Sequence, residues 1–303
     1  MNQALSVWLI LSLIWGTTWI FIKLGLRDLP PLTFAGLRFL LAASILWLIV
    51  LWRRREVPRR PGDWLLIAFT GFIAFAVNYG LIFWGEQYIN SGLAAVLQST
   101  IPAFGLVYAH YLLPAERITT RKLAGVFLGI AGTSVIFYDQ MKVEGAHALW
   151  GSLALLGSSV FMAYSNVLVK ARCRHLDPAT LAAGQMIFGF VPLLVLGALW
   201  EGSPFDLPWT RQSVVALLYL ALIGSSIAFL LYYWLLKHIA VTKTMLISLV
   251  TPVIALLIGM LTLSEHVSWR ILLGSAGILV GISLIVIERG GFKGKEIAVF
   301  HNR

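Results

Sequence analysis

Two stretches of this chain carry the same pattern. Trp84-Gly85-Glu86-Gln87-Tyr88-Ile89 leads to Gln98-Ser99-Thr100-Ile101-Pro102, and Trp234-Leu235-Leu236-Lys237-His238-Ile239 leads to Ser248-Leu249-Val250-Thr251-Pro252. Trp84, Ile89 and Pro102 each recur 150 positions later, as Trp234, Ile239 and Pro252. In each stretch the proline lies inside an apolar segment. The pair indicates that the chain contains an internal repeat.

The composition around these stretches is that of a membrane protein. The chain is 59% hydrophobic and 12% charged, with a mean hydropathy of +0.86, whereas soluble domains are nearer a quarter charged. Only helices or closed barrels satisfy the backbone in lipid, and a helix needs about 20 apolar residues to span it. The apolar runs here are continuous, which favours helices. We expect an all-α integral membrane protein with ten transmembrane helices, at about 4–24, 31–52, 64–85, 91–113, 121–138, 149–169, 178–199, 212–236, 244–263 and 268–288.

The positive charges predict how the helices are oriented. With the N-terminus in the cytoplasm, 17 of the 23 Lys and Arg residues fall on the inner side and 5 on the outer side, and Arg38 lies within a span. Inner loops are the ones enriched in Lys and Arg, so both termini are expected in the cytoplasm and the protein in the cell inner membrane. The net charge of +10 is then explained by topology and anionic lipid. We expect no nucleic-acid partner.

The repeat divides the chain into residues 1–143, residues 144–288 and a basic tail, 289–303. An offset of 149 relates Glu116 to Glu265 and Gly125 to Gly274, and an offset of 141 relates Gly16 to Gly157 in the first helix of each half. Five helices per half is an odd number, so the halves must run in opposite directions through the membrane. Two inverted five-helix repeats are the plan of many secondary transporters, which bind substrate between the halves.

Several motifs in this frame resemble a known family. They are Trp15-Gly16, the segment from Pro31 to Arg38-Phe39, Ser91-Gly92-Leu93-Ala94-Ala95 and Leu113-Pro114-Ala115-Glu116-Arg117. The chain resembles the EamA-type branch of the drug/metabolite transporter superfamily. The resemblance implies a ten-helix transporter of small organic solutes, often an exporter of amino acids or related metabolites. It also implies a central cavity lined by helices one, three, four, six, eight and nine. The second copy departs from the first, since Gln185 stands where the first has Arg38.

Aromatic and polar residues at membrane depth are the candidate substrate-binding residues. An aromatic stripe is often simple packing, but polar groups at this depth face an interior or a cavity. With few charges, such a site suits an apolar or aromatic zwitterion better than a phosphorylated compound. The candidates are Trp15, Thr18, Trp19, Asn78, Tyr79, Phe83, Gln98, Tyr164, Phe229, Tyr232, Tyr233 and Ser248.

Four further residues are candidates for gating. Pro102 and Pro252 each remove a backbone donor, which predicts either a hinge or a tolerated kink. Arg38 and Glu86 are expected toward the outer side, as parts of an outer gate. Arg38 is also compatible with a structural ion pair to Glu86, with a cation that snorkels outward, or with a contact to a substrate carboxylate.

Glycine stripes on the fifth and tenth helices predict close helix packing or a dimer face, so the chain is expected to be a monomer or a homodimer. The middle of each predicted span lacks Asp and Glu, which does not support coupling through a buried carboxylate.

The function predicted from the sequence is secondary transport. We expect the protein to export apolar or aromatic amino acids and related compounds by alternating access, with a small-molecule substrate and the lipid bilayer as its partners. A broad-specificity drug or metabolite exporter is the alternative. Outside the class of transporters, the alternatives are a membrane-embedded enzyme and a passive channel. The sequence shows no catalytic motif, and its histidines are scattered. We therefore expect no enzyme activity, cofactor or metal.

Overall fold

The computed structural model describes residues 3–89, 91–138, 141, 145–203, 207–254 and 269–287. Within these residues the regular structure is helical, with short turns between helices. Several helices begin with proline at the first helical position, where its missing N–H costs nothing. The helices are α1 (Gln3–Gly25), α2 (Pro31–Trp52), α3 (Pro61–Gly71), α4 (Asn78–Gly85), α5 (Ser91–Gln98), α6 (Ile101–Leu112), α7 (Thr120–Ile136), α8 (Gly145–Arg172), α9 (Pro178–Trp200), α10 (Arg211–Ala221), α11 (Ala228–His238), α12 (Val241–Met245) and α14 (Trp269–Ile287), with π-helical segments η1 (Phe72–Val77) and η3 (Leu222–Ile227).

The predicted fold class is confirmed. Eight helices in the described residues are long and apolar enough to cross a membrane, and a shorter apolar helix spans Val241–Ile254. The predicted span at 121–138 is α7, which has 17 residues, and about 25 Å of helix follows from that length. The second part of the predicted span at 244–263 lies outside the described residues, as do Glu265 and the tail 289–303.

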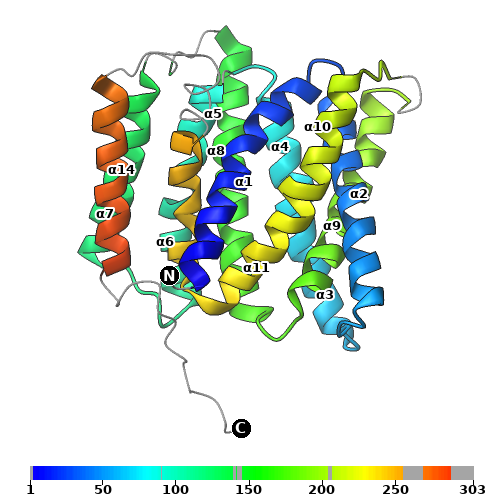
Figure 1. Ribbon diagram of the computed structural model, residues 1–303, viewed down its shortest axis with the longest axis horizontal. Helices are drawn as coiled ribbons and strands as arrows, with labels where there is room; N and C mark the ends of the chain where they lie inside the picture. The colour runs from blue at the N-terminus through cyan, green and yellow to red at the C-terminus, as the bar shows by residue number, and fades with distance from the viewer. Residues whose placement is uncertain are drawn as a thin grey trace, which may run out of the picture.

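The two halves run in opposite directions (Figure 1). Helix α1, the first of the first half, begins at the lower edge of the bundle and rises. Helix α8, the first of the second half, begins at the upper edge and descends. Helix α14 ends at the lower edge where α1 begins. The arrangement is that of an inverted repeat.

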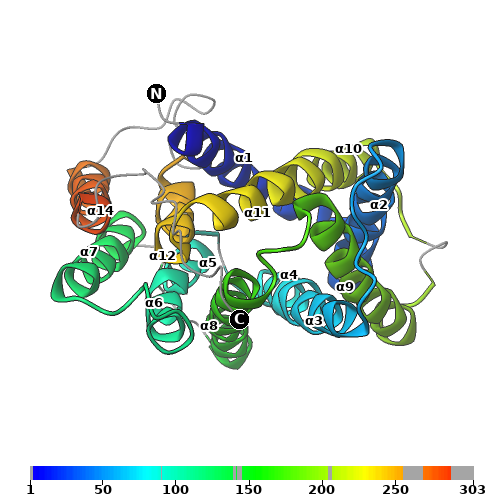
Figure 2. The same ribbon diagram turned by 90° about the horizontal axis from the view of Figure 1, so that it is seen from below.

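The two halves are interleaved rather than placed side by side. Helix α2 packs along α9, and α7 packs along α14, at opposite ends of the bundle (Figures 1 and 2). The second pair is in backbone contact. A Cβ built at Gly132 would lie 2.5 Å from the Gly274 carbonyl oxygen, and one at Gly125 would lie 2.6 Å from that of Gly281. These predicted glycine stripes therefore pack against each other within one chain.

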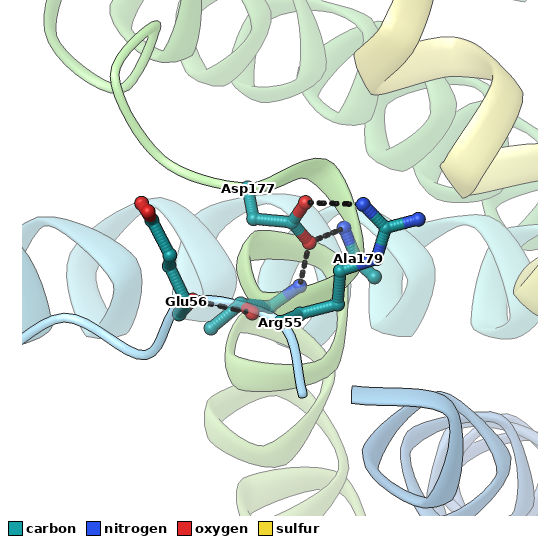
Figure 3. A network of polar contacts seen from close by, with 5 residues as sticks. Arg55, Glu56, Asp177 and Ala179 are labelled. Carbon is teal, nitrogen blue, oxygen red and sulfur yellow. Dashed lines mark hydrogen bonds and ion pairs between the residues drawn. The ribbon is translucent and has the colours of Figure 1, made fainter. Parts of the chain in front are cut away.

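A polar junction joins the end of α2 to the start of α9 (Figure 3). The Asp177 carboxylate caps α9 by accepting hydrogen bonds from the backbone N–H groups of Ala179 and Thr180, at 2.9 and 3.2 Å. The Arg55 guanidinium lies 3.7 Å from the same carboxylate, and the Thr180 hydroxyl donates to the Glu56 carbonyl at 2.9 Å. A capped helix start and an ion pair thus fix the two halves together at this edge.

Two glutamates make matching caps between the halves. Glu116 accepts hydrogen bonds from the N–H groups of Val241 and Thr242 and from the Thr242 hydroxyl, which caps α12. At the opposite edge, Glu201 makes the same three bonds to the start of α2, with Leu32 and Thr33 as donors. Each carboxylate satisfies N–H groups that a helix start leaves unpaired.

The two π-helical segments are related by the repeat. Both are six residues long, and η3 begins 150 positions after η1, the offset that relates Trp84 to Trp234. Segments of π-helix are rare and occur frequently at functional sites. The hydropathy pattern does not reveal them, because an extra residue in one turn leaves an apolar run apolar.

Candidate substrate cavity

A central cavity lies between the halves, next to both π-helical segments. About 750 Å³ of space lies between its atoms, and this figure includes its open mouth. Its walls come from the implied helices one, three, four, six, eight and nine, and additionally from helix two. The lining residues are Trp15, Thr18, Trp19, Ile22, Arg38, Asn78, Tyr79, Ile82, Gln98, Ile101, Met162, Asn166, Tyr232, Thr244, Met245, Ile247, Ser248 and Thr251.

The segment η3 presents a backbone carbonyl that two side chains of the first half share. The Gly224 oxygen accepts hydrogen bonds from the Trp15 indole at 3.3 Å and from Arg38 Nη2 at 3.2 Å. Arg38 Nε also donates to the Ser225 hydroxyl at 2.7 Å. The π-helix therefore ties α1 and α2 to α11 at the depth of the cavity.

Aromatic rings form the apolar wall around these groups. Trp15 lies 5.1 Å from Tyr232 and 5.6 Å from Phe229, measured between ring centroids. The Arg38 guanidinium carbon lies 5.1 Å from the centroids of Phe39 and Tyr79. Such faces suit both apolar groups and cations.

Three amide side chains line the cavity, those of Gln98, Asn78 and Asn166. Gln98 Nε2 donates to the Ser158 hydroxyl at 2.6 Å, which fixes this side chain between α5 and α8. Asn78 Nδ2 donates to the Ala74 carbonyl at 3.1 Å, whereas its Oδ1 has no hydrogen-bond partner. Because the bond to Ala74 fixes which end of the amide is the donor, the oxygen is a buried acceptor without a donor.

The structure brings most of the predicted substrate-binding residues to the cavity and leaves four out. Trp15, Thr18, Trp19, Asn78, Tyr79, Gln98, Tyr232 and Ser248 line it, together with Arg38. Phe83 packs on Phe34 and Tyr164 on Tyr108, while Phe229 and Tyr233 lie in the aromatic core.

Helical geometry explains the exclusions. Adjacent residues on a helix point about 100° apart, and on α11 Tyr232 faces the cavity while Tyr233 packs into the aromatic core. On α8 the lining residues are Met162 and Asn166, one turn apart, and Tyr164 lies between them on another face. The sequence-based candidates did not include Met162, Thr244 and Met245, whose residue types carry no cavity signal.

The structure places the predicted gating residues in different surroundings. Arg38 is 1% exposed and points inward, and it forms no ion pair with Glu86, so both the snorkelling and the ion-pair readings are wrong. The helix breaks at Ser99–Thr100, and Pro102 lies in the first turn of α6. Pro252 lies further inside its helix, six residues after the break at Leu246. The hinge role of both prolines stays a prediction.

Glu86 is buried just beyond the end of α4, one turn above the cavity-lining Ile82. It is 1% exposed, and its carboxylate oxygens have no hydrogen-bond partner. Burial raises the pKa of Glu86 to about 8, an effect that the nearby Lys23 ammonium only partly opposes. The side chain is therefore largely neutral at pH 7.

This pKa predicts a pH dependence of stability. Between pH 4.5 and about 8 the folded protein holds a proton that the unfolded chain has lost, so the free energy of unfolding falls as pH rises through that window and is level above it. We expect the melting temperature of the detergent-solubilised protein to fall across this range, and Glu86→Gln to fall less. Identical pH profiles for the two proteins would contradict the assignment.

Two lysines form a matched pair that the sequence did not reveal. Lys23 on α1 donates to the carbonyls of Glu86 and Ile89 at the end of α4, at 3.3 and 3.2 Å. Lys170 on α8 donates to the carbonyls of Leu236 and Ile239 at the end of α11. The lysines are 147 positions apart and the carbonyls 150. The offset of 141 chosen for the first helices is thus wrong, since it sets Lys23 against Tyr164.

Comparisons with known proteins agree with this architecture. The profile of the EamA-like transporter family matches residues 3–138 and 149–287. An uncharacterized transporter of Bacillus subtilis, YoaV, is 32% identical over 271 residues, covering 89% of this chain and 92% of that protein. The uncharacterized inner membrane transporter YedA of Escherichia coli K12 is 30% identical over 293 residues, covering 95% and 92%.

A solved crystal structure shares the fold. It has a TM-score of 0.79 and 19% sequence identity, and the match covers 94% of this chain and 96% of that one. With two family matches that span both halves, eight apolar spans and an inverted repeat, the chain is a multi-pass membrane transporter that belongs to the EamA-like transporter family.

Proposed function

We propose that this transporter exports apolar or aromatic amino acids and related compounds by alternating access. The observation that carries the proposal is the cavity, which combines an aromatic wall with three amides and, among its described lining residues, a single cation. A zwitterion with a large apolar side chain presents complementary groups to each of these. The interleaved inverted repeat supports alternating access, because each half offers the same helices to opposite sides of the membrane.

We further propose the cell inner membrane as its location, with both termini in the cytoplasm. The distribution of Lys and Arg supports this orientation. The positions of the start of α1 and the end of α14 at one edge agree with it (Figure 1).

Flux measurements in liposomes test the proposal. Purified protein is reconstituted, and a panel of labelled amino acids is offered with and without a pH gradient. We expect saturable, counterflow-competent flux of phenylalanine, tryptophan or leucine. Absence of saturable flux for every amino acid would contradict the proposal. Equal transport of unrelated organic cations would favour the broad-specificity exporter, and flux without saturation would favour a channel.

Substitutions in the cavity connect that flux to the site. Tyr79→Ala removes an aromatic wall and Gln98→Ala removes a fixed amide, so each is expected to lower flux about tenfold, the loss of one good contact. Phe127→Ala is the control, because this aromatic side chain is 65% exposed on α7, away from the cavity. Unchanged flux in both cavity variants, at equal amounts of reconstituted protein, would remove these residues from the site.

A further inference from the structure

We infer that Arg38 binds the carboxylate of the transported solute inside the cavity. The inference rests on the proposed function and narrows its substrate class to compounds that join a carboxylate to an apolar or aromatic body. Under this inference the cavity binds amino acids and aromatic acids in preference to the cationic compounds that a broad exporter would also move.

The contacts of Arg38 leave its charge without a counterion. Its Nε and Nη2 donate to a hydroxyl and a carbonyl, both neutral, and Nη1 has no hydrogen-bond partner. In the part of the chain that the structure describes, Arg38 forms no ion pair, whereas Arg55 pairs with Asp177 and His175 with Asp63. A buried cation without an anion is costly. A ligand carboxylate at Nη1 would supply both the counterion and the missing acceptor.

The position of Arg38 puts this charge where a substrate lies. It contributes to the wall of the cavity, and among the described lining residues it is the only Arg, Lys, His, Asp or Glu. Its counterpart in the second half is Gln185, which donates to the Thr70 hydroxyl at 2.6 Å and does not line the cavity. The repeat is thus broken at this position, and the cavity has one positively charged end.

The unpaired oxygen of Asn78 gives the cavity an acceptor to match the donor on Arg38. Both residues line the same space, and both atoms are buried without a partner. A zwitterion would satisfy them together, with its carboxylate on the guanidinium and its ammonium group on the amide oxygen. The aromatic wall from Trp15 and Tyr232 would then enclose the apolar side chain.

Three ligands of matched shape test the inference by isothermal titration calorimetry on the purified protein at pH 7. Phenylalanine carries both charges, 3-phenylpropionate lacks the amine, and phenethylamine lacks the carboxylate. We expect 3-phenylpropionate to bind the native protein more tightly than phenethylamine. Arg38→Gln should weaken 3-phenylpropionate binding about 10- to 100-fold, the effect of losing a charged hydrogen bond, without weakening phenethylamine.

Two further variants separate binding from support of the fold. Arg38→Lys keeps the charge without the planar fork, so it should retain the preference for the carboxylate with reduced affinity, and it serves where Arg38→Gln does not fold. Gln185→Leu, at the repeat-related position, should leave the preference unchanged. A purely structural role for Arg38 would instead lower the affinity for all three ligands alike in both Arg38 variants.

The outcomes distinguish this inference from the proposed function. Carboxylate-dependent binding that requires Arg38, without amino-acid flux in liposomes, would overturn the proposed function and support the inference. Amino-acid flux together with equal binding of 3-phenylpropionate and phenethylamine would overturn the inference alone. Failure of both carboxylates to bind the native protein would also overturn it.

Discussion

Gly274→Ala is expected to destabilise the protein by about 1–3 kcal/mol, the usual cost of overpacking. A Cβ at Gly274 would lie 2.4 Å from the Gly132 carbonyl oxygen and 2.5 Å from Ile136 Cγ1. The first of these atoms belongs to the backbone, so relief requires α7 and α14 to separate. Since small residues are what allow helices to approach closely in lipid, the melting temperature in detergent should fall and the monodisperse yield should drop.

Gly277→Ala on the same helix is the matched control. The nearest atom to a Cβ built there is the Gly132 Cα at 3.5 Å, an ordinary contact. This substitution should be tolerated, and the higher helix propensity of alanine should add stability. A loss of stability equal to that of Gly274→Ala would show that the close contact between the two helices is not the cause.

Glu116→Ala is expected to cost about 2–3 kcal/mol and to reduce transport as well. The carboxylate is 6% exposed and accepts three hydrogen bonds at the start of α12. Losing it leaves buried N–H groups unpaired. Thr244 and Met245, which line the cavity, lie in the same short helix, so loosening its start should disturb the site.

Glu116→Gln tests the requirement for an acceptor on both oxygens. One end of the glutamine amide becomes a donor that faces the donors of Thr242, so this isosteric variant should recover only part of the lost stability. Glu201→Ala, at the matching cap of α2, should lower stability by a smaller amount, because its three hydrogen bonds are only partly buried. Full stability of Glu116→Gln would contradict the proposed role of the charge. The stability of each variant is measured by thermal unfolding in detergent, and its transport by flux in liposomes.

The spans and the repeat could be predicted from the sequence because their signals are local. An apolar run of sufficient length has few alternatives in a membrane, and Trp, Pro and Gly recurring in order are rare enough to reveal a duplication. The glycine stripes likewise predict close packing, although the choice between packing inside the chain and packing between chains depends on where α14 lies.

Only part of the cavity could be predicted from the sequence, because the orientation of its side chains depends on contacts between residues far apart in the chain. The inward orientation of Arg38 is set by Ser225, 187 positions away, and a cation at that depth is equally compatible with an outward orientation. Phe83 and Phe229 lie on α4 and α11 at regular helical spacing from the cavity-lining Tyr79 and Tyr232, but neighbouring helices enclose their rings in the core. Which part of an apolar helix face meets the cavity is therefore set by contacts that the spacing does not encode. The lysine pair was missed because the first helices of the two halves share too few distinctive residues to align correctly.

The pairing of α7 with α14 has a consequence for how the protein is made. Helix α14 begins 133 residues after α7 ends, so at roughly 5–20 residues per second of synthesis the interval is on the order of ten seconds. During that time the glycine face of α7 has no partner from its own chain. Helix α2 likewise lacks its packing partner until α9 has been synthesised. The first half of the transporter therefore cannot complete its assembly during its own synthesis, and the pairing of α7 is completed only when α14 has been made.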